Sequence, residues 1–179
     1  EKIAEGLDGL QKRLVEYAIW GAKFTKWRAV ITVGKNIPTR GCVRANALIL
    51  ARFAVMSQAA GLVPIIEPEV LMDGDHTIET CQNVTEMVGQ MVFEALEEQR
   101  VDFVGMLYKP NMVVAGKDCP KQPGIGEVAK KTVETMNKLV SVRVPGITFL
   151  SGGQDAKIAT ARLNGIAKIG AGASWRWTF

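Results

Sequence analysis

MLYKPNM, at residues 106–112, places Lys109 at the end of an apolar, strand-like run that begins at Phe103. A strand that is buried on both faces of a parallel sheet has a continuous apolar sequence of this kind. A charged residue at its end is either solvated or lies over a barrel mouth or a sheet crevice, where chemistry is done on such folds. The rest of the chain decides between these two interpretations.

Strand-like and helix-like segments alternate along the whole sequence. The spacing of apolar residues predicts helices near residues 7–21, 43–60, 77–99, 127–140 and 154–168. The strands between and after them centre near Val30, Ile65, Leu107, Thr148 and Trp177, the last of which begins near Ser174. Their mean spacing is roughly 37 residues. This alternation predicts a parallel sheet with helical crossovers.

A closed barrel fits this sheet better than an open, doubly wound sheet. No G-x-G-x-x-G motif follows any predicted strand, and the polar residues of interest come from several strands instead of one switch point. At roughly 37 residues per unit, eight units need about 300 residues. We therefore predict an α/β fold, a (β/α)8 TIM barrel of which this chain supplies about the last five strands. Residues 1–179 are expected to form a single domain, a partial barrel truncated at both ends.

The composition excludes several classes of protein. The chain has 179 residues, of which 47% are hydrophobic and 22% charged, enough for one globular core. Its net charge of +4 is spread along the sequence, which favours neither a nucleic acid nor a membrane as partner. No apolar run approaches the roughly 20 residues of a membrane span. Cys42, Cys81 and Cys119 lack C-x-x-C spacing, which predicts reduced thiols in a cytoplasmic protein and no zinc site.

Polar residues suited to catalysis recur at the ends of the predicted strands. Lys26 and Arg28 are two residues apart and therefore share a strand face. Glu67 ends the second predicted strand, and Ser-Gly-Gly at residues 151–153 follows the fourth. Each motif alone is typical of a solvated strand end, a loop carboxylate or a helix lead-in. Together with Lys109, on neighbouring units, they predict one shared site.

A lysine beside a carboxylate permits Schiff-base chemistry. The lysine attacks a carbonyl only as the free amine, so its pKa must fall below the reference value of about 10.4, through apolar burial or nearby cations. Lys109 has an apolar strand behind it and Lys26 and Arg28 as candidate neighbours. The iminium is then an electron sink for C–C cleavage, and Glu67 can accept a proton from the hydroxyl of the carbon that is released. The Ser-Gly-Gly segment exposes backbone N–H groups of the kind that hold a phosphate.

Four motifs together resemble the class I (Schiff-base) fructose-bisphosphate aldolases: TKWR at residues 25–28, VPIIEPE at 63–69, LYKPNMV at 107–113 and GITFLSGGQ at 146–154. By this resemblance Lys109 forms the Schiff base, Glu67 is the main general acid and base, and Lys26 assists proton transfer. Arg28 would bind one phosphate of the substrate. Ser151 and Gly152 would bind the C1 phosphate of the ketose.

The resemblance also implies a reaction and an assembly. The family reversibly cleaves fructose 1,6-bisphosphate to dihydroxyacetone phosphate and glyceraldehyde 3-phosphate in glycolysis and gluconeogenesis, usually as a homotetramer. Its ligands are small sugar phosphates, and its mechanism uses neither a metal nor another cofactor. We expect the same of this chain, in the cytoplasm.

The sequence departs from the family at several points, and alternatives stay open. Val104 and Tyr108 stand where the family commonly has glutamate and leucine. Neither is a catalytic position, so these departures bear on the subfamily more than on the activity. The family's early-strand aspartate and lysine, its arginine after the last strand and its C-terminal tyrosine have no counterparts. The alternatives are another Schiff-base sugar-phosphate lyase on the same fold, or a catalytically inert barrel fragment with a structural or interaction role. A metal-dependent aldolase is disfavoured because His76 is the only histidine.

Overall fold

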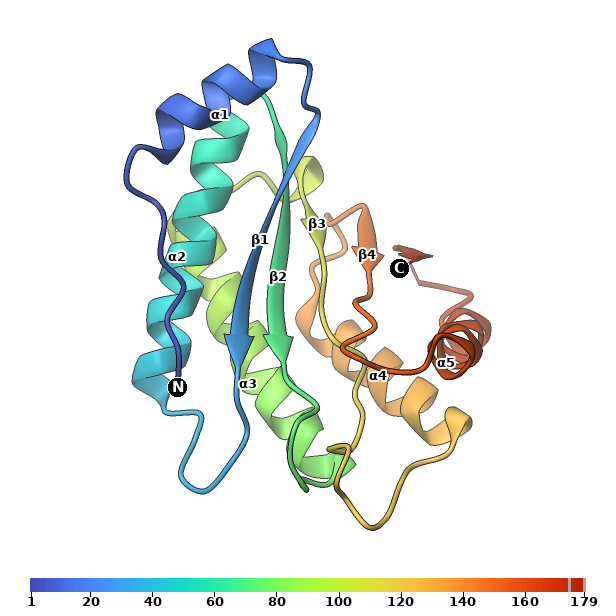
Figure 1. Ribbon diagram of the computed structural model, residues 1–179. Helices are drawn as coiled ribbons and strands as arrows, with labels where there is room; N and C mark the ends of the chain where they lie inside the picture. The colour runs from blue at the N-terminus through green and yellow to red at the C-terminus, as the bar shows by residue number, and fades with distance from the viewer. Residues whose placement is uncertain (174, 179) are drawn as a thin grey trace.

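A computed structural model describes residues 1–173 and 175–178 as a sheet of five parallel strands with helices between them (Figure 1). In spatial order the strands are β1 (Phe24–Ile31), β2 (Val63–Val70), β3 (Leu107–Tyr108), β4 (Gly146–Thr148) and β5 (Arg176–Thr178). The helices are α1 (Leu10–Ile19), α2 (Arg40–Ala59), α3 (Ile78–Glu98), α4 (Ile125–Leu139) and α5 (Ala156–Ile169). The predicted alternation and the parallel sheet are confirmed. The predicted start of the last strand, Ser174, lies outside the described residues.

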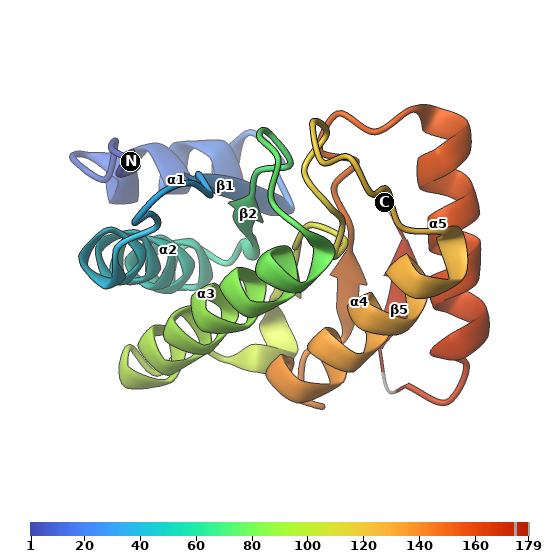
Figure 2. The same ribbon diagram turned by 90° about the horizontal axis from the view of Figure 1, so that it is seen from below.

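Four of the helices follow the outside of the sheet. From below, α2, α3, α4 and α5 form an arc around the strands (Figure 2). Helix α2 packs on β1 and β2, and each later helix of the arc packs on the one before it. On the opposite, inner face of β1 the side chains of Phe24, Lys26 and Arg28 are exposed and can form part of a site.

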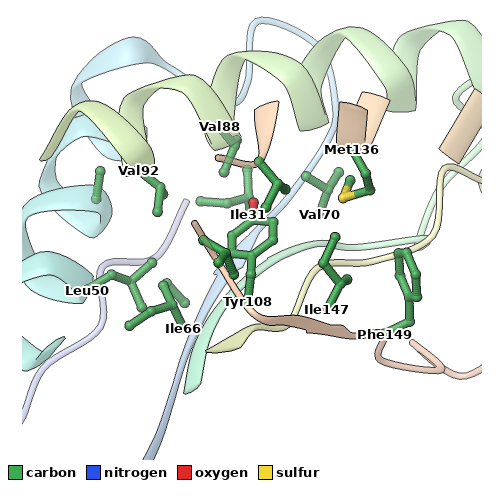
Figure 3. Packing of buried hydrophobic residues seen from close by; sticks show 14 of the residues in the cluster. Ile31, Leu50, Ile66, Val70, Val88, Val92, Tyr108, Met136, Ile147 and Phe149 are labelled. Atoms are coloured by element: carbon green, nitrogen blue, oxygen red, sulfur yellow. The ribbon is translucent and has the colours of Figure 1, made fainter. Parts of the chain in front are cut away.

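The hydrophobic core lies between the outer face of the sheet and the helices. Every second residue of β1 and β2 points outward, and Ala29, Ile31, Ile66 and Val70 are buried there. Figure 3 shows the contributions of the strands and of the segment after β4, namely Ile31, Ile66, Val70, Tyr108, Ile147 and Phe149, close to those of the helices, namely Leu50, Val88, Val92 and Met136. This packing holds the strands in register and thereby fixes the residues on the inner face.

A short 3-10 helix, η1 (Phe103–Gly105), replaces the first half of the strand that the sequence predicts at 103–109. Asp102 Oδ1 accepts a hydrogen bond from Val104 N at 3.1 Å, and the Gln58 side chain bonds both backbone groups of Asp102. These bonds turn the chain before it can join the sheet. Lys109 still follows the strand directly, and its N–H donates to Ile66 O at 2.8 Å.

Strand β2 continues three residues past Glu67, where the sequence predicted a loop. Leu71 N donates to Ile31 O at 2.9 Å, so the odd-numbered N–H groups of this strand face β1. Pro68, at an even position, therefore lacks an N–H only on the side of β3, which pairs with β2 at residues 65–66 alone. The proline is tolerated, and Glu69 shares the inner face with Glu67.

Candidate active site

Charged side chains gather on the inner face of β1 and β2. Lys26 and Arg28 are the third and fifth residues of β1 and share this face. In register, Lys26 lies opposite Ile65 and Arg28 opposite Glu67, but each cation reaches the carboxylate two residues further along β2. The predicted positions at strand ends are thus wrong for Lys26, Arg28 and Glu67. These residues lie inside strands, because β1 begins two residues before Lys26 and β2 continues three residues past Glu67.

The carboxylate of Glu67 lies between two amines. Its Oε2 is 3.0 Å from Lys26 Nζ and its Oε1 is 3.4 Å from Lys109 Nζ. The Glu67 side chain is only 5% exposed, whereas the Lys26 and Lys109 side chains are 42% and 28% exposed. Glu67 Oε2 forms an ion pair with Lys26 Nζ, but no described residue donates a hydrogen bond to this oxygen. A buried carboxylate is thereby neutralised by two amines that both remain open to a ligand.

Backbone hydrogen bonds fix the segment that carries Lys109. Its own N–H is bonded to Ile66 O, and on the other side Leu150 N donates to Pro110 O at 3.1 Å. The buried Asn111 amide accepts from the N–H at the end of β2 at 3.0 Å and donates to a threonine of α3 at 3.1 Å. Lys109 is therefore held at the junction of β2, β3 and the segment after β4.

Glu69 belongs to the site although the sequence placed it in a loop. It is buried, and its Oε2 lies 2.5 Å from Arg28 Nε. This hydrogen bond and the charge of Glu69 raise the pKa of Arg28, which therefore stays charged. The two Nη groups of Arg28 make no hydrogen bond within the described residues and are therefore available to bind an anion. The two-residue spacing from Glu67 was the sequence signal for Glu69.

Residues 151–153 form a turn beside these charges. Gly152 and Gly153 have φ values of 64° and 88°, in the left-handed region that favours glycine. A Cβ on Gly152 would lie 3.0 Å from Leu150 Cδ1 and 3.9 Å from Glu69 Oε1, so this side of the turn lies close to Leu150 and Glu69. The sequence predicted that this segment opens a helix. Instead α5 begins after Asp155, whose side chain caps the helix. The turn is therefore separate from the helix, and its backbone N–H groups make no hydrogen bond within the described residues.

One cavity of about 860 Å³ unites these groups. Its lining includes all six residues that the sequence nominated, Lys26, Arg28, Glu67, Lys109, Ser151 and Gly152. Glu69, Asp73 and several apolar side chains, including Phe24 and Ile65, complete the wall. A cavity of this size, with amines, a guanidinium and free backbone N–H groups on its wall, suits a small phosphorylated ligand.

The described part of the chain contains no candidate metal site. Among residues 1–173 and 175–178, no group of three His, Cys, Asp or Glu side chains is arranged to hold a metal ion. His76 is buried, and this burial lowers its pKa. No helix within the same residues is long and apolar enough to span a bilayer.

Comparison with known proteins gives a consistent result. The family model for class-I fructose-bisphosphate aldolase matches residues 1–179. A probable class 1 fructose-bisphosphate aldolase of Xanthomonas campestris is 51% identical over 170 residues, which cover 95% of this chain and 51% of the relative. Fructose-bisphosphate aldolase B of Gallus gallus is 45% identical over 179 residues, which cover 100% of this chain and 49% of the relative.

A solved structure shows the same fold. A chain from the ternary complex of Plasmodium falciparum fructose-bisphosphate aldolase with TRAP and a small-molecule inhibitor has a TM-score of 0.98 and 44% identity. The match covers 100% of this chain and 52% of that chain. The predicted partial TIM barrel is confirmed, and the chain spans about half the length of the relatives that it matches.

Proposed function

The chain belongs to the class-I fructose-bisphosphate aldolase family, and we propose that it supplies the covalent and acid–base groups of such an enzyme. Lys109 forms the Schiff base and Glu67 transfers protons, with assistance from Lys26. The observation that carries the proposal is the position of the Glu67 carboxylate, 3.4 Å and 3.0 Å from the amines of Lys109 and Lys26.

The chemistry follows from these neighbours. The Lys109 amine adds to the C2 carbonyl of fructose 1,6-bisphosphate, and loss of water gives an iminium. Glu67 takes the proton of the C4 hydroxyl, the C3–C4 bond breaks, and its electron pair moves to the iminium to give an enamine. Glyceraldehyde 3-phosphate leaves at this point. Protonation of the enamine and hydrolysis then release dihydroxyacetone phosphate and regenerate Lys109.

The two phosphates of the substrate bind to two different groups on the cavity wall. The turn at 151–153, through Ser151 and Gly152, holds the C1 phosphate, because its N–H groups have no acceptor within the described residues. The unbonded Nη groups of Arg28 bind the other phosphate in the two-pronged manner of guanidinium groups. The enzyme acts in glycolysis and gluconeogenesis, in the cytoplasm and as a homotetramer.

Borohydride trapping tests the proposal directly. The 179-residue chain is incubated with dihydroxyacetone phosphate, reduced with borohydride and examined by intact and peptide mass spectrometry. We expect one adduct, on Lys109. It should be absent from Lys109→Gln and unchanged in Lys130→Gln, which removes an exposed lysine of α4.

The alternatives have their own outcomes in the same experiment. Absence of any adduct on Lys109 would mean that the chain is catalytically inert by itself. An adduct with a different keto-sugar phosphate, but none with dihydroxyacetone phosphate or fructose 1,6-bisphosphate, would indicate another Schiff-base lyase.

A further inference from the structure

Arg162 occupies an unusual position on α5. The buried residues of this helix are Ala159, Arg162 and Ile166, so the arginine lies in the middle of the apolar stripe. It is 9% exposed, and burial lowers its pKa. An arginine at such a position is costly unless its donors are used.

The hydrogen bonds of Arg162 lead to the turn at 151–153. Its Nη1 donates to Gln154 Oε1 at 2.6 Å, and its Nε has no partner within the described residues. No carboxylate of residues 1–173 or 175–178 lies within ion-pair distance of it. The guanidinium is thus a buried cation whose described side-chain partner is a neutral amide.

The arginine determines which way the Gln154 amide points. Since a guanidinium can only donate, the amide oxygen must face Arg162 and the NH₂ group must face away. That NH₂ group donates to Ser151 O at 2.8 Å, and Gln154 N donates to the same oxygen at 3.2 Å. Both bonds hold the Ser151 carbonyl toward Gln154, which leaves the N–H groups of the turn for the cavity.

We propose that Arg162 is a positioning residue for the phosphate-binding turn and acts through the Gln154 amide. The pair fixes the Ser151 carbonyl, and the buried guanidinium adds positive potential behind a turn that binds an anion. This inference rests on the proposed function only in taking residues 151–153 as a phosphate site. It assigns a role to two residues that do not line the cavity.

Inorganic phosphate titration of the ¹⁵N-labelled 179-residue chain provides the test. In the parent chain the amide resonances of Gly152 and Gly153 should shift with added phosphate and yield a Kd. Arg162→Met, which keeps an unbranched apolar stem but removes the guanidinium and its charge, should raise that Kd about 3- to 10-fold, the effect of about one hydrogen bond. Lys157→Met removes the same charge from an exposed position on α5 and should change the Kd less than about twofold.

Gln154→Glu separates positioning from plain structural support. A glutamate still accepts from Arg162, so the free energy of unfolding should stay equal or increase through the new ion pair. It cannot donate to Ser151 O, so the phosphate Kd should rise about 3- to 10-fold despite intact stability. Asn164→Asp, an exposed amide-to-carboxylate change on the same helix, is the control for charge. This variant carries the test if Arg162→Met fails to fold.

Two results would overturn the inference, and they are distinguishable. If Gly152 and Gly153 shift in the parent chain but Gln154→Glu binds phosphate as the parent does, the positioning role is wrong while the phosphate site stands. If phosphate leaves these resonances unmoved in the parent chain, the turn is not a phosphate site, and that part of the proposed function fails too.

Discussion

Ile66 and Glu67 are neighbours in the sequence of β2 but belong to different parts of the molecule. Ile66 is fully buried against the helices, whereas Glu67 is buried between two lysines on the inner face. Because successive strand residues point to opposite faces, a slip of one residue in register would exchange them. The apolar face therefore stabilises the position of the charged face, and substitutions at these neighbours should have opposite signatures.

The inner face itself changes character along β1 and β2. At the first register pair, Phe24 is 62% exposed and Val63 38% exposed, and both are apolar. Further along the same face, Lys26 and Arg28 follow on β1, and Ile65, Glu67 and Glu69 follow on β2. The inner face thus changes from apolar to charged toward the carboxyl ends of β1 and β2.

Glu67→Gln should have the largest effect and should act on chemistry alone. The amide keeps the shape of the side chain but can neither take up nor deliver a proton. Because loss of water from the carbinolamine on Lys109 needs a proton donor, Lys109 should form its trapped adduct about 10²- to 10⁴-fold more slowly. The free energy of unfolding should change by less than about 1 kcal/mol, because both lysines remain partly solvated. Time-resolved mass spectrometry of the reduced adduct and urea unfolding give the two values.

The matched control is Glu134→Gln on the exposed face of α4, which should alter neither value. An adduct that forms at the parent rate in Glu67→Gln would remove Glu67 from proton transfer during Schiff-base formation.

Ile66→Ala should produce the reverse result. Removing a fully buried side chain from the core should lower the free energy of unfolding by about 3 kcal/mol. Adduct formation on Lys109 should be unchanged in the molecules that remain folded. Urea unfolding and trapping at low urea measure the two quantities.

Ile65→Ala tests whether the loss of unfolding free energy depends on the strand face or only on the replacement of an isoleucine. Ile65 lines the cavity and is partly exposed, so its truncation should cost about 1 kcal/mol or less. Equal losses at positions 65 and 66 would contradict the division into a packed and a reactive face.

The sequence correctly predicted those parts of the molecule in which apolar residues recur at the regular spacing of a helix or a strand. Alternating strand and helix patterns predicted the parallel sheet, and a lysine after an apolar run drew attention to Lys109, which lines the cavity. Glu69 was missed because Pro68 was taken to end the strand, although its missing N–H faces the side where β3 is short. The turn at 103–105 was missed because it depends on Gln58, more than 40 residues away.

The link from Arg162 to the turn at 151–153 has no sequence signal of this kind. Arg162 lies on the face of α5 that is turned toward the segment preceding the helix. The link also depends on the orientation of the Gln154 amide, which bonds both Arg162 and Ser151 O. Only the packing of α5 brings these groups together. Residues that orient others are therefore harder to predict than residues that react.

The difference between Gly152→Ala and Gly153→Ala should be the smallest of these effects, and it extends the comparison to the turn itself. Gly152 and Gly153 both have positive φ, so alanine at either position should cost about 1 kcal/mol in backbone strain. At Gly152 the new Cβ would also press on Leu150 at 3.0 Å, whereas Gly153 has open space. Urea unfolding should therefore give a loss about 0.5 to 1 kcal/mol greater for Gly152→Ala than for Gly153→Ala.

The same pair of variants tests whether the backbone geometry of the turn determines phosphate affinity or only the stability of the fold. Because the Gly152 side of the turn packs against Glu69, a shift there moves the N–H groups relative to the charged cluster, and phosphate affinity should fall with stability. At Gly153 stability should fall with little change in affinity. Equal losses of phosphate affinity in the two variants would show that the turn binds through its flexibility instead of through a fixed geometry.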